Sequence, residues 1–268
     1  MRCLIDAEVA LSVTVPGRVA FTLATAAGAD REELTLSDSF ASEVVEFAHG
    51  TRTHVFDLPA RDFSLRYQAE CEIKPAEPQP LTTADLAIYT RPSRYCPTDR
   101  MGFAMAEFGN LEGDRAKVDA IVGYVHDRMS YVVGSGSPVD DAVDRLLAGE
   151  GVCRDFAHIC VALCRVVDIP ARYVSVYAPG LSPMDFHAVF EAVIDGHWYV
   201  FDATRLAPRQ SLVRVATGRD AADTAFVATL GGCEIDFRGT GLFVTAEPGL
   251  PEDDGSALIP LAGSAPRS

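Results

Sequence analysis

The chain has 268 residues, of which 48% are hydrophobic and 23% are charged, a balance typical of a folded globular protein. Its length favours a main domain with a smaller domain attached. The formal net charge of −15 repels the phosphates of nucleic acids and of anionic lipids, so we expect no nucleic-acid partner and no membrane partner.

The N-terminal segment lacks the pattern of a secretory signal, because Asp6 and Glu8 interrupt its apolar run. No stretch approaches the roughly 20 apolar residues that cross a bilayer, and we therefore expect a cytoplasmic protein. The seven cysteines are odd in number and form no CxxC pair, which argues against a disulfide framework and against a zinc site. Most of them are predicted to be reduced thiols.

The first part of the chain predicts antiparallel β-strands. Residues 3–15 alternate apolar and polar side chains, and residues 54–60 and 63–73 behave similarly. We assign residues 1–74 to a small N-terminal β-rich domain. Three prolines in the next six residues then favour an extended linker over residues 75–92.

Two helices are predicted after the linker. The apolar spacing of residues 115–129 indicates an amphipathic helix. The next helix is expected to begin at Ser137 as N-cap, with Pro138 at its first position and Asp140 closing a capping box. Gly149 is the predicted stop of that helix.

A third helix begins near Cys153 and ends before Pro170. Strands are predicted beyond it at residues 172–179, 186–194 and 197–204. The last two are joined by Asp195-Gly196, a strong signal for a two-residue hairpin turn.

The order of elements predicts an α+β fold, with helices packed on an antiparallel sheet, because helices and strands are grouped and do not alternate. The main domain is assigned to residues 93–246, including strands at its C-terminal end. Residues 247–268 are rich in Pro, Gly, Ser and Asp and are expected to form a flexible tail.

Cys153 is a candidate nucleophile because it stands at the N-terminus of its predicted helix. Unpaired N–H groups and the helix dipole stabilise a thiolate there and could hold an oxyanion, and Gly151 is expected to let a substrate backbone approach. Cys160 and Cys164 follow in the apolar stripe and are interpreted as small core residues. His158, about 140° around the helix axis from Cys153, is predicted to be structural. From helix position alone, a packing role for Cys153 stays open.

The hairpin register supplies a base and a carboxylate that orients it. A two-residue turn at residues 195–196 sets Asp202 opposite Val189. His187 then shares a face with Val189 and lies diagonal to Asp202, at roughly 7–8 Å between backbones, which a side-chain hydrogen bond can span. His197 falls on the opposite face. A thiol presented by the preceding helix would complete a Cys-His-Asp site.

The chain resembles the core of the transglutaminase-like superfamily in three segments taken in order: GVCRDFAH from Gly151, DIPARYVSVY from Asp168 and DFHAVFEAVIDGHWYVFDAT from Asp185. That family has a papain-like catalytic unit that uses Cys, His and Asp in this chain order. The resemblance therefore implies Cys153 as nucleophile, His187 as base and Asp202 as orienting carboxylate. Upstream, TRPSRYCPTD resembles a segment of bacterial members that carry an N-terminal β-domain, proteins usually described as transglutaminase-like proteins or as cysteine proteases.

The chain also departs from the animal transglutaminases, which use an upstream Trp near the oxyanion. The only tryptophan here is Trp198, inside the hairpin and after the nucleophile. Tyr95, whose hydroxyl could donate to an oxyanion, is the candidate for that role, with packing as the alternative. The calcium sites of those enzymes are not evident, because the acidic cluster at residues 140–144 falls on one predicted helix. We predict no metal and no cofactor.

The predicted reaction begins with attack of the Cys153 thiolate on a peptide or protein amide. His187 protonates the leaving amine, and a thioester remains on the cysteine. Hydrolysis of a peptide or isopeptide bond is the first expectation, because no feature marks an amine site. Transamidation of protein glutamine to an amine acceptor is the alternative. A non-catalytic peptide-binding scaffold is the third possibility, and the combination of Cys, His and Asp argues against it. No oligomeric state is predicted.

Overall fold

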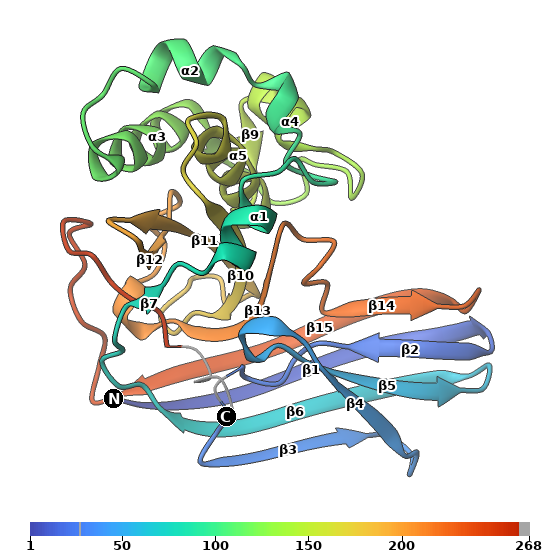
Figure 1. The fold of residues 1–268 in the computed structure, drawn as a ribbon. Coiled ribbons are helices and arrows are strands. Elements are labelled where there is room, and N and C mark those ends of the chain that lie inside the picture. Colours follow the sequence, from blue (N-terminus) through green and yellow to red (C-terminus); the bar gives the residue numbers. More distant parts are fainter. Residues whose placement is uncertain (27, 263–268) are drawn as a thin grey trace.

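Long antiparallel strands form the lower half of the molecule in Figure 1, and helices gather above a further sheet in the upper half. The structure is a computed structural model, and it describes residues 1–26 and 28–262. Its mixture of grouped helices and antiparallel sheets confirms the α+β class that the sequence predicts.

The lower half is a β-sandwich of two four-stranded sheets around one apolar core. The first sheet has the strand order β15-β1-β6-β3 and the second has the order β14-β2-β5-β4. The strands are β1 (Arg2–Val15), β2 (Gly17–Phe21), β3 (Arg31–Leu36), β4 (Ser42–Glu46), β5 (Arg52–Leu58), β6 (Asp62–Glu72), β14 (Val227–Leu230) and β15 (Glu234–Glu247). In β1, alternate residues from Cys3 to Val13 are buried, as the period-2 pattern predicts.

Strands β14 and β15 correct the predicted domain boundary. The sequence assigned residues 93–246 to one domain, but β14 pairs with β2 and β15 pairs with β1. The N-terminal strands alone would leave the outer edges of β1 and β2 unpaired, and the C-terminal strands cover both edges. The β-sandwich is therefore built from both ends of the chain.

The third sheet has the order β13-β10-β11-β12-β7. Its strands are β7 (Gln79–Pro80), β10 (Ala171–Tyr177), β11 (His187–Ile194), β12 (His197–Phe201) and β13 (Val213–Gly218). The hairpin of β11 and β12 pairs Ile194 with His197, the register that a two-residue turn predicts. Asp195 and Gly196 both adopt positive φ, 48° and 78°, as the favoured hairpin turn requires.

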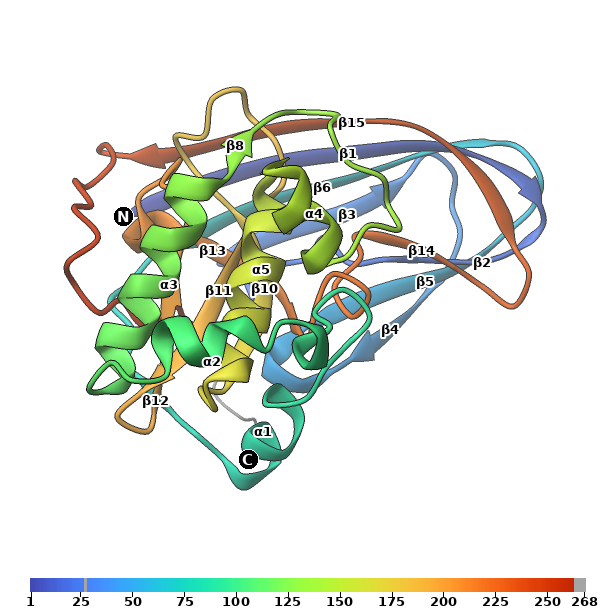
Figure 2. The same ribbon diagram turned by 90° about the horizontal axis from the view of Figure 1, so that it is seen from above.

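Five α-helices accompany this sheet within the described residues: α1 (Thr83–Tyr89), α2 (Phe103–Phe108), α3 (Asp114–Arg128), α4 (Ala142–Ala148) and α5 (Cys153–Val166). Figure 2 shows α5 in the middle, with α2, α3 and α4 around it. The apolar face of α5 packs on β10 and β11, and its other sides meet α3 and α4. Of the residues that the structure describes, no helix has the length and apolar content to cross a membrane.

The helix after α3 begins later than the sequence predicts. Its N-cap is Asp141, whose carboxylate accepts hydrogen bonds from the N–H groups of Val143 and Asp144, while the Asp144 carboxylate accepts the backbone N–H of Asp141. This complete capping box fixes the start at residue 142, and Ser137 instead lies in a turn closed by Asp140. Gly149 ends the helix with φ 72°, as expected.

Two segments predicted to be extended or flexible are built into the fold. The predicted linker, residues 75–92, contains β7, which extends the third sheet beside β12, and α1, which is capped by Thr82 and Asp85. The predicted tail packs against the third sheet as far as residue 262, where Leu261 is buried. In each segment, the stabilisation from burying apolar side chains outweighs the tendency of a Pro- and Gly-rich composition to remain unstructured. Residues 263–268 of that tail lie outside the described residues.

Candidate active site

Cys153 is the first residue of α5 and stands at the edge of the third sheet. Its side chain packs with Ala157, Tyr173 and Ala188, and its thiol donates to the carbonyl of Phe186 at 3.8 Å. Phe186 directly precedes β11. The first turn of the helix thus presents the thiol to the start of the strand that carries His187, where unpaired helix N–H groups favour an anion.

Asp155 fixes the start of α5. Its carboxylate accepts the backbone N–H of Val152 at 2.9 Å and the side chain of Arg154 at 2.9 and 3.1 Å. A Cβ at Gly151 would lie 2.8 Å from the Asp155 side chain, closer than such atoms approach. Gly151 therefore makes room for the carboxylate that starts the helix, and not for a substrate backbone as the sequence suggested.

His187 and Asp202 meet as the hairpin register predicts. Nε2 of His187 donates to Oδ2 of Asp202 at 2.8 Å, and both side chains are buried. The other carboxylate oxygen accepts the N–H and hydroxyl of Thr204 at 2.8 and 2.7 Å. Nδ1 of His187 has no hydrogen-bond partner among the described residues. It is the ring nitrogen left for the thiol.

The electrostatics of this pair favour a protonated imidazole. Burial works against the charged ring, but the charge and hydrogen bond of Asp202, followed by the Cys153 thiol, raise the pKa of His187 to about 10. Burial likewise disfavours the Asp202 carboxylate, yet His187 and Thr204 lower the pKa of Asp202 below its usual range. The site is therefore arranged to hold an imidazolium between a carboxylate and a sulfur.

Tyr131 is a site residue that the sequence reasoning missed. It ends the two-residue strand β8 (Ser130–Tyr131), which pairs in parallel with β9 (Glu150–Gly151), two residues before Cys153. Burial, then the charge of the Cys153 thiolate, raises the pKa of the Tyr131 hydroxyl, so this hydroxyl lies close enough to Cys153 to respond to its charge. A tyrosine upstream of the nucleophile, with a hydroxyl that can donate a hydrogen bond, is the pattern that could have identified it. Tyr131 fits this pattern as well as Tyr95 does.

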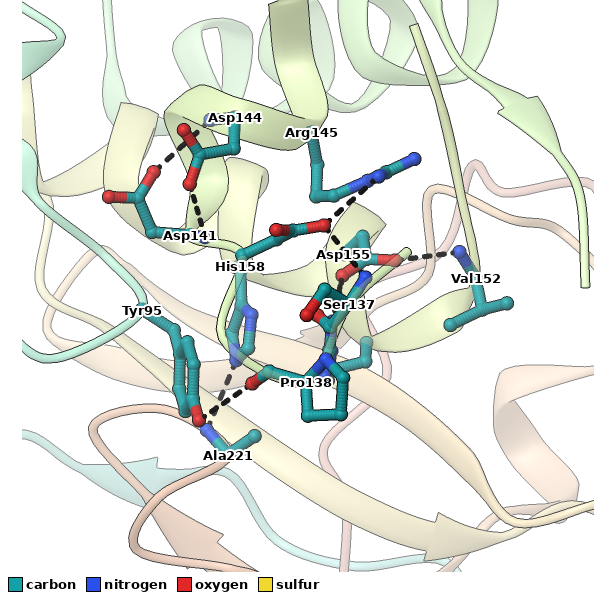
Figure 3. A network of polar contacts seen from close by, with 12 residues as sticks. Tyr95, Ser137, Pro138, Asp141, Asp144, Arg145, Val152, Asp155, His158 and Ala221 are labelled. Carbon is teal, nitrogen blue, oxygen red and sulfur yellow. Dashed lines mark hydrogen bonds and ion pairs between the residues drawn. The ribbon is translucent and has the colours of Figure 1, made fainter. Parts of the chain in front are cut away.

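The structure gives the Tyr95 hydroxyl another partner (Figure 3). The hydroxyl donates to the carbonyl of Pro138 at 3.0 Å, and the ring stacks on His158 at 5.2 Å between centroids. On its other side His158 meets Tyr173, and its Nε2 accepts the N–H of Ala221 at 3.1 Å. Burial and nearby arginines hold the pKa of His158 well below its usual range. Both side chains are engaged in joining α5 to the surrounding loops.

The other two cysteines of α5 lie in the core between the helix and the sheet. Cys160 and Cys164 are fully buried, whereas Cys153 retains 8% of its surface. Burial raises the pKa of both core thiols, and Cys164 also comes under the opposing charge of Arg165. These surroundings suit inert thiols.

The geometry described so far is that of a thiol site in which Cys, His and Asp come from a helix N-terminus and two neighbouring strands. The family model described as the transglutaminase-like superfamily matches residues 104–203, a range that contains all three side chains. The crystal structure of a candidate cysteine protease from Cytophaga hutchinsonii is similar to this chain with a TM-score of 0.87 and 32% sequence identity, covering 98% of each chain.

Two further proteins are similar to the chain at lower identity. The uncharacterized protein ML0607 of Mycobacterium leprae is 26% identical over 202 residues, which is 66% of this chain and 71% of that protein. The periplasmic domain of TgpA from Pseudomonas aeruginosa has 14% identity and a TM-score of 0.43, covering 78% of this chain and 92% of its own. Because the family model matches and the Cytophaga protein is similar over nearly its whole length, the chain belongs to the transglutaminase-like superfamily.

Proposed function

We propose that this protein is a cysteine-dependent amide hydrolase in which Cys153, His187 and Asp202 act as a triad on a peptide or protein amide. The observation that carries the proposal is the 2.8 Å bond from His187 Nε2 to Asp202. It leaves Nδ1 free beside a thiol at a helix N-terminus, which is the arrangement that an activated nucleophile requires.

In the proposed mechanism, His187 takes the thiol proton of Cys153, and the thiolate attacks the amide carbonyl carbon. A C–S bond forms and the carbonyl π electrons move to oxygen. The tetrahedral intermediate then expels the amine, which takes its proton from His187 as the C–N bond breaks. Water adds to the thioester with His187 as base, and the C–S bond breaks to release the acid and restore the thiol.

Tyr131 is the proposed donor to the oxyanion. The pairing of β8 with β9 brings Tyr131 to the strand that ends two residues before Cys153, and its hydroxyl responds to the Cys153 charge. In the proposal, a carbonyl oxygen bound there would meet both this hydroxyl and the N–H groups at the start of α5. Two such donors stabilise the charge that develops on the oxygen. Tyr95 is not assigned this role, because its hydroxyl is bonded to Pro138.

A matched pair of cysteine variants tests the proposal. Cys153→Ala is expected to abolish turnover of peptide p-nitroanilides and rapid alkylation by iodoacetamide, with little change in the melting temperature. Cys160→Ala removes a sulfur from the closed core on the same helix, so it should keep the activity and lower stability by about 1 kcal/mol. Peptide mapping after alkylation at pH 6 and calorimetry measure both effects.

The outcome that would sink the proposal is a Cys153 that reacts with iodoacetamide no faster than free cysteine at pH 6. A primary amine added to the turnover assay separates hydrolysis from transamidation. Under the proposal the product is the free acid, and amine incorporation into the acyl product would indicate the transamidase instead.

A further inference from the structure

The last described residues return from the β-sandwich to the third sheet and form what we call the C-terminal strap, residues 253–262. In Figure 1 this red segment leaves β15 and rises beside β12. The N–H of Val200 in β12 donates to the carbonyl of Ile259 at 2.8 Å. Leu261 is 4% exposed and packs with Val189 and Val200, which lie on the sheet face that also carries His187 and Asp202. The strap therefore covers part of the sheet face that carries His187 and Asp202.

One ion pair joins the strap to the loop that begins at Asp202. Asp253 accepts three hydrogen bonds from Arg209: the backbone N–H at 2.9 Å, Nε at 2.8 Å and Nη2 at 2.8 Å. The remaining Nη1 donates to the carbonyl of Val200 at 3.2 Å. Both charged side chains are at least nine-tenths buried. The guanidinium holds the pKa of Asp253 well below its usual range, and such a two-pronged pair fixes geometry strongly.

The loop of residues 202–209 is also held from α3, where Nδ1 of His126 donates to the carbonyl of Ala203 at 2.8 Å. A cavity of about 630 Å³ lies behind it, lined by the loop itself, by α3 residues such as Arg115 and by residues 253–256 of the strap. Within the loop, Thr204 is the residue that holds the Asp202 carboxylate. An empty space of this size gives the loop room to retreat if its far end is released.

The strap is anchored at two further places. Nη2 of Arg115 in α3 donates to the carbonyl of Ser256 at 2.9 Å. Nη2 of Arg214 in β13 donates to the carbonyl of Leu261 at 3.1 Å, and the same guanidinium is paired with buried Glu191. With Val200 and Arg209, the strap is bonded to four separate elements. Arg209 is the anchor that lies on the Asp202 loop.

We infer that Asp253 is a positioning residue of the active site: through Arg209 it holds the 202–209 loop at the place where Asp202 meets His187. The inference rests on the proposed function, since it concerns the same triad. Releasing the pair moves Asp202 away from the imidazole, so His187 binds its proton less tightly and gives less support to a thiolate at Cys153.

The test compares Asp253→Asn with Asp254→Asn in the full chain. The two variants make the same change in charge at neighbouring positions, but Asp254 bonds only to Ser256 within the strap. Asp253→Asn is expected to slow alkylation of Cys153 by iodoacetamide at pH 6 by roughly tenfold and to move the rise in reactivity to higher pH. Asp254→Asn should match the wild type. Arg209→Ala added to Asp253→Asn should cause little further loss of alkylation rate, because the ion pair is already broken and the side chain of Arg209 retains only its bond to the carbonyl of Val200.

A second measurement reads the pair directly. The downfield proton NMR signal of the His187 Nε2–H bonded to Asp202 should weaken or shift in Asp253→Asn and persist in Asp254→Asn. If Asp253→Asn lowers only the melting temperature and leaves the alkylation profile and this signal unchanged, the pair is structural. The inference is then wrong, and the proposed function is not affected. If wild-type Cys153 itself reacts like an ordinary thiol, the inference fails together with the proposed function.

Discussion

Two histidines in this molecule each meet an aspartate, and their surroundings make them opposites. His187 bonds Asp202 at 2.8 Å in the active site, while Nε2 of His49 lies 3.4 Å from Oδ1 of Asp85 where the β-sandwich meets the third sheet. The pKa of His187 is raised to about 10. Burial, followed by the charge of Arg172, lowers the pKa of His49 to about 4 even though Asp85 pulls it upward.

The aspartate is closer to His187, at 2.8 Å, than to His49, at 3.4 Å, and the group on the other ring nitrogen adds to the difference. Nη1 of Arg172 is 3.2 Å from Nδ1 of His49, so this nitrogen must accept a hydrogen bond and cannot carry a proton. At His187 the corresponding nitrogen faces the Cys153 thiol, which gains from a proton on the ring. A carboxylate beside a buried histidine is therefore not enough to make a base, because the group on the other ring nitrogen decides which form is stable.

Replacing each histidine in turn is the strongest way to break this comparison. His187→Gln is expected to lower turnover of a peptide p-nitroanilide by roughly 10³-fold or more, because it removes both the base and the group that protonates the leaving amine. His49→Gln keeps the triad and should retain most of the turnover. Comparable losses in the two variants, both shown to be folded by circular dichroism, would contradict the distinction drawn here.

A tyrosine also lies near each site, Tyr131 near Cys153 and Tyr89 near His49, and replacing each of them is expected to have a smaller effect than replacing the histidines. Tyr131→Phe should lower turnover by about 10²-fold, the usual result of losing one oxyanion donor, and should leave alkylation of Cys153 intact because alkylation develops no oxyanion. Tyr89, whose ring lies 5.8 Å from His49, offers the control Tyr89→Phe, which should change neither rate. A Tyr131→Phe enzyme with wild-type turnover would remove this tyrosine from the mechanism.

The smallest predicted effect is on the free energy of unfolding. One histidine contributes to it on the alkaline side of the pH range and the other on the acid side. The pKa of His49 is lowered on folding, so its contribution is present above about pH 6.5 and is lost as the pH falls toward 4. The pKa of His187 is raised, so its contribution is present below about pH 6.5 and is lost as the pH rises toward 10.

Urea unfolding across pH 4 to 10 measures these contributions. His49→Gln should flatten the acid side of the profile of unfolding free energy, and His187→Gln should flatten the alkaline side. Flattening on the same side in both variants would show that the two sites are not opposites.

Local patterns in the sequence account for most of the candidate site. The Asp195-Gly196 turn fixes the register of β11 and β12, and that register alone brings His187 to Asp202. The helix from Cys153 follows from its apolar stripe. These predictions needed only neighbours within one helix or one hairpin, where periodicity and turn chemistry determine geometry.

What the sequence did not reveal depends on contacts between distant segments. Tyr131 reaches Cys153 through the short parallel pairing of β8 and β9, and a ladder of two residues has no pattern of its own. The same holds for β14 and β15, whose alternation marks them as strands but does not say that they pair with β2 and β1. The strap's packing depends on Arg209 and Arg214, which lie 44 and 47 residues before their bonding partners Asp253 and Leu261.

The pairing of β1 with β15 has a consequence for how the protein is made. Arg2 is opposite Glu247 in this ladder, so β1 can complete the pairing with its outer partner only after residue 247 has left the ribosome. Contacts between such distant residues form slowly, and open strand edges invite aggregation in the meantime. We expect the strap to dock after β15 has paired, so that the nascent enzyme gains its catalytic geometry last and shorter translation products remain inactive.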